Sequence, residues 1–459
     1  MTTSSLAQRR HNRPSSMFFW PTPERPVAVR GEGIHIIDED GNRYIDASAG
    51  PQTANIGHAN PRVLAAMAEQ AAKISFAFRS QFKNEPAEAF ADELAEVTPD
   101  GLDMAFFASG GSEAVEAAIK LARQHAIAVG EGSRYKIISR IPSYHGGTLG
   151  ALSLTGDPQM FGPFAPMMPI MPKIPAPFCA YRPAGQSAED AAIGFADALE
   201  EMILNQGPET VLAFIMEPVG GASTGALTAP DVYYTRTRDI CRKYGVLLIY
   251  DEVMSGAGRT GKYLAAEHWG IVPDIAVLAK GLASGYVPLG AIMTRREMVQ
   301  RVEAAGGFAH GHTYSASPFA CAVGRAVLKE HLDNDLIGNA ARMGDRLKAK
   351  LTELMDEFEF IGEVRGRGLL LAFDVVADRK TGKALPKDLN AYLELAQEAY
   401  DRGLVIYSRR VMDGRRGDHF LISPPLIVTP DQVDEIAGLL REALAAFAPK
   451  ARAAMREAS

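Results

Sequence analysis

Two stretches of the sequence decide the fold: residues 245–263, GVLLIYDEVMSGAGRTGKY, and residues 273–291, PDIAVLAKGLASGYVPLGA. Each contains a short apolar run, VLLIY or IAVLA, and each run ends at a charged residue, Asp251 or Lys280. Apolar runs of this length predict β-strands that are buried on both faces of a sheet. Because the sites of open α/β sheets lie at the carboxyl ends of their strands, both charges are candidates for one site.

Similar runs recur through the middle of the chain and alternate with helical patterns. The predicted strands are Met104–Ala108, Tyr135–Ser139, Val211–Met216, Val246–Tyr250, Asp274–Ala279 and Gly290–Met293. The predicted helices are Glu113–Val129, Ser187–Leu204 with Ser187 as its N-cap, and Pro230–Tyr244. This alternation predicts an α/β fold, with a mostly parallel central sheet and helices on both of its faces.

The two ends of the chain follow other patterns. An Asp-Gly turn at residues 40–41 between apolar runs predicts a hairpin over residues 34–46. Helices are predicted at Pro61–Lys73 and Pro86–Val97 and, beyond residue 320, at Ala320–Leu332, Asn339–Glu357 and Pro430–Phe447. Strand-like pieces at residues 368–376 and 419–425 complete a predicted second unit of smaller α+β type.

Composition excludes several classes of protein. Of the 459 residues, 47% are hydrophobic and 22% charged, which is typical of globular proteins with a sizeable core. The net charge of −7 gives no general attraction to nucleic acid. Three widely spaced cysteines suit neither a disulfide framework nor a metal cluster, so we expect a cytoplasmic protein without a metal site.

The sequence also indicates that the protein does not span a membrane. The longest apolar stretch, residues 161–178, is interrupted by six prolines, so it cannot form a spanning helix. It has instead the pattern of an extended surface or interface loop. Basic residues near the N-terminus lack a following apolar run, so we expect no secretory signal.

Charged residues that follow buried strands are the candidates for chemistry. A partly desolvated Lys280 would have a lowered pKa and could form a Schiff base, although its side chain could also extend to solvent. Asp251 and Glu217 each close a strand and need a cation or hydrogen-bond donors, which a structural ion pair or cap would equally provide. Glu252 should point away from Asp251 by strand alternation.

A glycine-containing turn, Ser109-Gly110-Gly111-Ser112, leads from a predicted strand into a helix. Free amide groups at a helix start bind phosphate, although the same residues could form a simple turn capped by Ser112. The spacing matches neither a Walker loop nor a dinucleotide fingerprint. A phosphate-binding turn, a lysine and an aspartate are together the parts that pyridoxal phosphate requires, and Tyr144 is placed to stack on its ring.

These motifs resemble those of the class III (ω-amino acid type) aminotransferases, which are pyridoxal-phosphate enzymes of fold type I. The resemblance extends from about Arg30 to Phe447 and includes, besides the two opening stretches, SGGSEAVEAAIKLAR, SYHGGTLGALSLTG, IMEPV, GHTYSASP and VRGRGLLLAF. It implies a large cofactor-binding domain at residues 71–318. It also implies a small α+β domain, built from an N-terminal segment, residues 1–70, and from residues 319–459.

The resemblance also implies roles for individual residues. Lys280 would be the Schiff-base lysine and acid/base group, Asp251 would pair with the pyridine nitrogen, and Tyr144 would complete the catalytic residues. The further cofactor contacts would be Gly110, Gly111, Ser112, His145, Glu217, Val253 and Thr313, the last reaching the phosphate of a neighbouring subunit. The expected substrate contacts are Trp20, Gln52, Arg415 and Arg416. The same resemblance implies a homodimer with shared sites and leaves open whether two dimers form a tetramer.

Three departures from the family pattern concern the substrate. Met254 stands where the ornithine branches have glutamine, and this favours the pyruvate- or diamine-using branches. Gln52 stands where several amine–pyruvate relatives have a bulky aromatic, which predicts a more polar pocket wall. The phosphate turn lacks one side-chain hydroxyl.

Four arginines precede the Pro-Pro pair, and Arg415 or Arg416 is favoured for binding a keto-acid carboxylate because a guanidinium binds carboxylate in a bidentate manner.

The leading hypothesis is an aminotransferase that moves an amino group from a primary amine or ω-amino acid to a keto acid, with pyruvate favoured, by a ping-pong mechanism. The alternative is a lyase, acting on an ammonia or phosphate group, or a decarboxylase of the same fold that acts on a small amino compound. A binding protein that has lost catalysis is disfavoured, because Lys280 and Asp251 are both present.

Overall fold

A seven-stranded sheet forms the centre of the molecule in the computed structural model, which describes residues 17–18, 25–410, 412–414 and 417–458. Its order is β4 (Met104–Ala108), β10 (Gly290–Thr294), β9 (Ile275–Leu278), β8 (Leu247–Asp251), β7 (Val211–Met216), β5 (Lys136–Ile141) and β6 (Lys173–Pro175). Strand β10 runs antiparallel to both of its neighbours, and the pairs from β9 to β6 are parallel. The predicted mostly parallel sheet is therefore confirmed.

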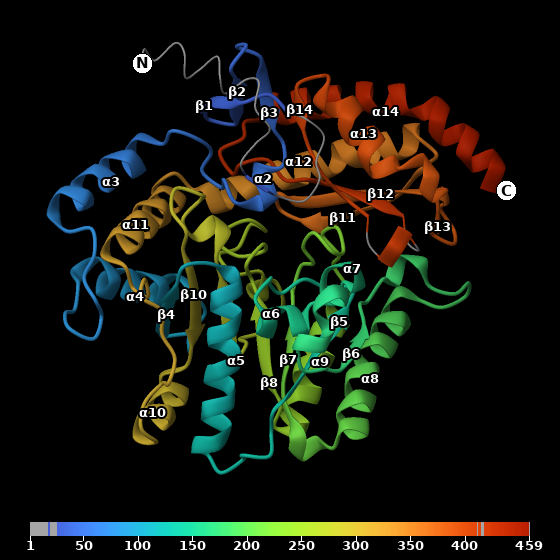
Figure 1. The fold of residues 1–459 in the computed structure, drawn as a ribbon. Coiled ribbons are helices and arrows are strands. Elements are labelled where there is room, and N and C mark those ends of the chain that lie inside the picture. The colour runs from blue at the N-terminus through green and yellow to red at the C-terminus, as the bar shows by residue number, and fades with distance from the viewer. Residues whose placement is uncertain (1–16, 19–24, 411, 415–416, 459) are drawn as a thin grey trace.

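Helices cover both faces of this sheet (Figure 1). Helix α5 (Gly111–Ala128) packs on one face, and α4 (Glu85–Val97), α8 (Ala188–Gln206) and α9 (Asp231–Tyr244) pack on the other. In β7, Leu212 and Ile215 contact the α5 side, whereas Phe214 and Met216 contact the opposite side. Burial on both faces explains why the strands are continuous apolar runs. Ser187 caps α8 as predicted, since its hydroxyl accepts a hydrogen bond from the amide of Asp190 at 3.0 Å.

The proline-rich segment, residues 161–178, differs from the predicted loop. It contains a 3-10 helix, Gly162–Met167, and the strand β6, which pairs in parallel with β5 at the edge of the sheet. Proline is tolerated there because an edge strand leaves one row of backbone groups unpaired. No helix among the described residues is long and apolar enough to cross a membrane.

A second unit lies above the sheet and is built from both ends of the chain (Figure 1). Strands β1 (Ala28–Glu32), β2 (His35–Asp38), β3 (Arg43–Asp46) and β14 (Leu404–Val405) form one small sheet, in which β3 and β14 are parallel. A second sheet contains β11 (Ile361–Arg367), β12 (Leu370–Asp378), β16 (Asp418–Ile422) and β15 (Tyr407–Arg409), and β13 (Lys383–Ala384) pairs with β12. The predicted hairpin near the N-terminus is thus present as β2 and β3.

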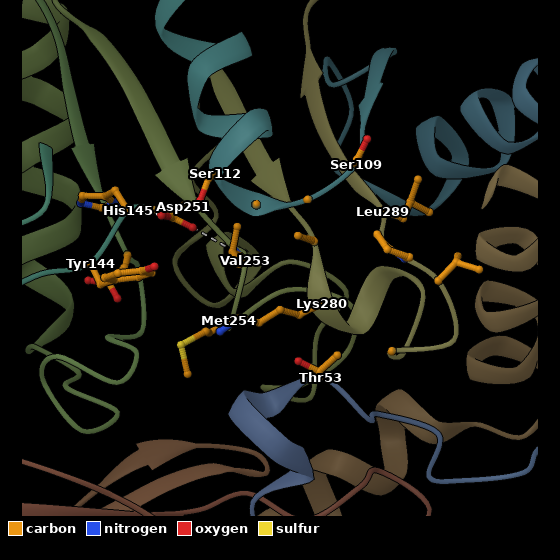
Figure 2. A pocket seen from close by; sticks show the side chains of 18 residues that line it. Thr53, Ser109, Ser112, Tyr144, His145, Asp251, Val253, Met254, Lys280 and Leu289 are labelled. Atoms are coloured by element: carbon orange, nitrogen blue, oxygen red, sulfur yellow. Dashed lines mark hydrogen bonds and ion pairs between the residues drawn. The ribbon is translucent and has the colours of Figure 1, made fainter. Parts of the chain in front are cut away.

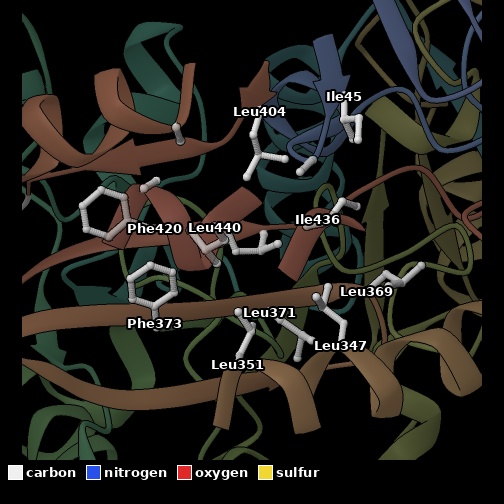
Figure 3. Packing of buried hydrophobic residues seen from close by; sticks show 14 of the residues in the cluster. Ile45, Leu347, Leu351, Leu369, Leu371, Phe373, Leu404, Phe420, Ile436 and Leu440 are labelled. Atoms are coloured by element: carbon white, nitrogen blue, oxygen red, sulfur yellow. The ribbon is translucent and has the colours of Figure 1, made fainter. Parts of the chain in front are cut away.

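One hydrophobic core joins these sheets to helices α11 (Pro318–Asp333), α12 (Leu336–Glu357), α13 (Ala391–Tyr400) and α14 (Pro430–Ala458). Figure 3 shows Phe373 and Phe420 in this core, with ring centroids 5.2 Å apart. Helix α14 continues past the predicted end at Phe447, and Ala451 and Ala454 extend its buried face. The short helices α2 (Ala49–Gln52) and α3 (Pro61–Lys73) lead into the large unit. The domain boundaries at residues 70 and 318 stay a prediction.

Candidate active site

A cavity of about 420 Å³ lies at the carboxyl ends of the central strands, on the side that faces the second unit (Figure 2). Eleven residues singled out in the sequence line it: Ser109, Gly110, Gly111, Ser112, Tyr144, His145, Glu217, Asp251, Val253, Met254 and Lys280. These residues lie at the carboxyl ends of five strands, β4, β5, β7, β8 and β9, so the sheet brings them together.

Lys280 follows β9 and begins a short 3-10 helix, Lys280–Leu282. Its backbone has φ of +49°, in the left-handed region that a residue with a side chain seldom adopts, and such strain is found at functional sites. Burial lowers the pKa of Lys280 to about 8, although the charges of Asp251 and Glu217 act in the opposite direction. The amine is therefore substantially neutral, and nucleophilic, in mildly alkaline solution.

The lowered pKa predicts how the cofactor-free protein responds to pH. Only the neutral amine attacks an aldehyde, so the initial rate at which pyridoxal phosphate binds to Lys280 should rise with pH to a plateau, with a midpoint of about 8. An ordinary lysine would give a midpoint of about 10.4. Stopped-flow absorbance measures this rate, with Lys280→Ala as the blank. A midpoint near that of free lysine would contradict the prediction.

Asp251 and His145 form a buried pair beside the lysine. One carboxylate oxygen, Oδ2, lies 2.8 Å from His145 Nδ1, and the other, Oδ1, accepts a hydrogen bond from the amide of Val253 at 3.1 Å. Both oxygens are thereby fixed, which orients the carboxylate toward the cavity. Glu252 faces the other way, as strand alternation predicted: its carboxylate accepts hydrogen bonds from the amide of Ala266 at 2.8 Å and from Ser255.

The turn that precedes α5 fits a phosphate group. Gly110 is the N-cap of α5, and the first amides of any helix have no carbonyl partner within it. A side chain at Gly111 would lie 3.2 Å from Val253 Cγ1, so glycine keeps the turn open to the cavity. The hydroxyl of Ser112 accepts a hydrogen bond from the amide of Gly147 at 3.0 Å, which joins this turn to the Tyr144 loop.

Glu217 reaches the cavity from the end of β7. Its Oε1 accepts a hydrogen bond from the amide of Gly221 at 2.9 Å, and its buried Oε2 has no partner among the described residues. Burial and the charge of Asp251 raise the pKa of Glu217, against the influence of His145 and Arg140. Arg140, which donates to the Glu217 carbonyl at 2.5 Å, did not emerge from the sequence. The available signal was a charged residue near the carboxyl end of a buried strand, β5.

Tyr144 forms a wall of the cavity on the side away from Lys280 (Figure 2). Burial raises the pKa of its hydroxyl, while Arg409 lies close enough for its charge to lower that pKa. Val253 lies between Asp251 and Lys280 in the same view. Thr53, which the sequence gave no reason to choose, also lines the cavity.

Other sequence predictions fall outside this cavity. Thr313 is exposed in the loop before α11, and its predicted contact with a neighbouring subunit stays a prediction. Gln52 is 1% exposed and both of its amide atoms lack partners among the described residues, but it does not belong to the lining given above. Trp20, Arg415 and Arg416 lie outside the described residues.

The sequence model of the class III aminotransferases matches residues 21–444. The chain belongs to this family. It is 40% identical to the uncharacterised aminotransferase YodT of Bacillus subtilis, over 92% of this chain and 95% of that protein. It is 32% identical to the putrescine–pyruvate aminotransferase of Pseudomonas aeruginosa, over 91% of this chain and 90% of that one.

Solved structures agree with this assignment. A thermostable (S)-enantioselective ω-transaminase from Thermomicrobium roseum is similar with a TM-score of 0.89 and 34% identity, over 97% of this chain and 99% of that one. An amine transaminase from an uncultivated Pseudomonas species, solved with pyridoxal phosphate bound, is similar with a TM-score of 0.87 and 34% identity, over 95% of this chain and 98% of that one. This class III aminotransferase therefore has fold type I and uses pyridoxal phosphate.

Proposed function

We propose that the enzyme transfers an amino group from a primary amine or ω-amino acid to a keto acid, with pyruvate as the acceptor, in a ping-pong mechanism. The observation that carries the proposal is the presence of the Lys280 amine beside the Asp251–His145 pair in one cavity. The putrescine–pyruvate relative supports this choice of donor and acceptor.

Bound pyridoxal phosphate supplies an electron sink for the carbon that loses or gains a proton. The amides of Gly110, Gly111 and Ser112 would bind the phosphate, and Tyr144 and Val253 would hold the ring from its two faces. Asp251 would keep a proton on the pyridine nitrogen, and His145 fixes its carboxylate for this task. Lys280 would bind the cofactor covalently and, once released by substrate, move the proton at the reacting carbon.

A carboxylate-bearing substrate requires a cation near the cavity entrance, and the arginines before residue 424 are candidates. Arg410 is bound by Asp418 through two contacts of 2.9 Å, so its charge is already compensated. Arg409 is 32% exposed, makes a longer contact of 3.4 Å with Asp157 and lies near Tyr144. We include Arg409 with Arg415 and Arg416 as a carboxylate-binding candidate.

We also propose the homodimer that the family resemblance implies. Tyr314, next to Thr313, is 65% exposed and contacts Phe76 edge-on, with ring centroids 5.9 Å apart. Ile74, Phe78 and Phe82 are also exposed. An apolar surface beside Thr313 supports a second subunit at this position, with shared sites.

The test is the visible absorbance of the purified holoenzyme during stepwise additions. A panel of diamines, ω-amino acids and aryl amines is added first, without any keto acid, and pyruvate or 2-oxoglutarate follows. We expect the absorbance band of the bound cofactor to bleach stoichiometrically when a primary amine is added and to return when pyruvate is added. Turnover of an amine with an unchanged band would identify a lyase and overturn the proposal. Substituting methionine for Arg409, Arg415 or Arg416 one at a time then identifies the carboxylate contact, through a raised KM for the keto acid alone.

A further inference from the structure

The loop of residues 218–227 links the cavity to the second unit. It begins directly after Glu217 and is largely buried. Val219 and Ala226 of this loop pack with Met254, which lines the cavity, and with Leu370 and Leu421 of the second unit. The loop therefore touches both the site and the C-terminal sheet.

Two buried side chains of that sheet hold the loop by its backbone. Arg365, on β11, donates from Nε to the carbonyl of Gly225 at 2.6 Å and from Nη2 to the carbonyl of Thr224 at 3.1 Å. His419, on β16, donates from Nε2 to the carbonyl of Ala222 at 2.7 Å. Burial and nearby arginine charge lower the pKa of His419 to about 3, so the ring is neutral and Nε2 carries its proton for this bond.

The guanidinium is itself fixed in place. Asp374, on the strand between β11 and β16, accepts from Arg365 Nη1 at 2.8 Å and from the hydroxyl of Tyr181 at 2.8 Å. Gly225 has φ of +61°, and a methyl group there would lie 2.7 Å from His419 and 2.9 Å from Arg365. The close approach of backbone and guanidinium thus depends on glycine at this position.

A continuous chain of hydrogen bonds leads from Arg365 to the cavity. The amide of Gly225 donates to the carbonyl of Gly221 at 2.9 Å, and the amide of Gly221 donates to Glu217 Oε1 at 2.9 Å. This last hydrogen bond fixes Oε1 of Glu217, whereas Oε2 has no partner among the described residues.

We propose that Arg365 and His419 are positioning residues, which set the carboxylate of Glu217 in the cofactor cavity by holding the loop of residues 218–227. The inference rests on the proposed cofactor contact of Glu217. Neither side chain belongs to the cavity lining given above, so each acts through the loop. An arginine suits this role because its planar fork reaches two carbonyls and a carboxylate at once, which lysine cannot do.

The experiment measures the dissociation constant of pyridoxal phosphate by titrating the cofactor-free protein, together with the absorbance spectrum of the bound form. Arg365→Lys and His419→Leu should each weaken cofactor binding by about tenfold or more, by analogy with the residues that orient metal ligands from behind. Gly225→Ala adds a methyl group to the loop where it would meet His419 and Arg365, so it should displace the loop and weaken binding in the same way. Arg367→Lys is the matched control, because Arg367 lies on the same strand and donates instead to Asp231. It should leave the constant unchanged.

A double-mutant cycle with Glu217→Gln separates positioning from general destabilisation. If Arg365 acts through Glu217, Arg365→Lys should weaken binding much less in the Glu217→Gln background than in the native one. Melting curves verify that each variant is folded. Fully additive effects, or folded Arg365→Lys and Gly225→Ala variants with native affinity, would overturn the inference. The titration needs no substrate. If the variants weaken cofactor binding as expected but the enzyme transfers no amino group, only the proposed function is contradicted.

Discussion

Replacing Lys280 by alanine lowers the rate of amino transfer by at least about 10⁴-fold, because one side chain supplies both the covalent attachment and the acid/base group. The phosphate turn and Asp251 are untouched, so the variant should still bind pyridoxal phosphate without a covalent bond. Single-turnover absorbance with the best donor measures the rate. Borohydride reduction and peptide mass spectrometry should find the cofactor on the peptide of Lys280 in the native protein and on none in the variant.

Lys173 offers a matched control for this experiment. Burial lowers its pKa to about 8, as for Lys280, and its Nζ donates to the carbonyl of Ser153 at 2.7 Å in the sheet edge. Lys173→Met should therefore keep the native rate within a few fold. The comparison tests whether location in the cavity, rather than a lowered pKa alone, makes a lysine catalytic. A Lys280→Ala variant with more than about a hundredth of the native rate would contradict the assignment.

Asp251→Asn is expected to lower the rate by about 10²–10³-fold while the cofactor stays bound. The amide is nearly isosteric with the carboxylate but carries no charge, so it cannot stabilise a protonated pyridine nitrogen. It also leaves His145 without its carboxylate partner. The rate under saturating donor, together with the spectrum of the bound cofactor, measures the effect. Asp251→Glu keeps the charge at a changed distance and should lose less activity than the amide.

Glu252 is the control for Asp251, because the two carboxylates are adjacent in sequence and face opposite sides of the strand. Burial raises the pKa of Glu252 to about 7, and its hydrogen bonds involve Ser255 and Ala266 rather than the cavity. Glu252→Gln should change stability more than rate, by about 1–2 kcal/mol for a weakened buried hydrogen bond. A loss of rate equal to that of Asp251→Asn would refute the separation of roles.

The sequence predicted best those elements whose ends carry a local signal. Strands β4 and β7 have the predicted bounds because they coincide with apolar runs. Helix α3, although mostly exposed, has them because it begins at Pro61, and proline favours an early helix position. The end of α14 was missed, since alanines that extend a buried face resemble alanines on a solvent-facing helix. Strand β6 was missed because prolines mask an edge strand, where only the neighbouring strand decides whether the segment pairs.

The candidate site divides in the same way. Lys280, Asp251 and the 109–112 turn could be found from sequence because a charge or glycine after a buried strand is unusual by itself. Arg365 and His419 could not, because each donates hydrogen bonds to backbone carbonyls of a loop distant in the chain, and a carbonyl carries no signature in the sequence. At the start of the chain the sequence pointed to Gln52, whereas the structure places its neighbour Thr53 in the cavity lining.

Strand periodicity, a local property, was enough to predict the fold class from the sequence, and the motifs indicated the family and its cofactor by their resemblance to class III aminotransferases. The tertiary structure alone decided which groups meet. The parallel sheet gathers strand ends far apart in the chain into one cavity, and the second unit holds the Glu217 loop through Arg365. Such contacts depend on distances between elements, and those distances are fixed only when the two units pack against each other.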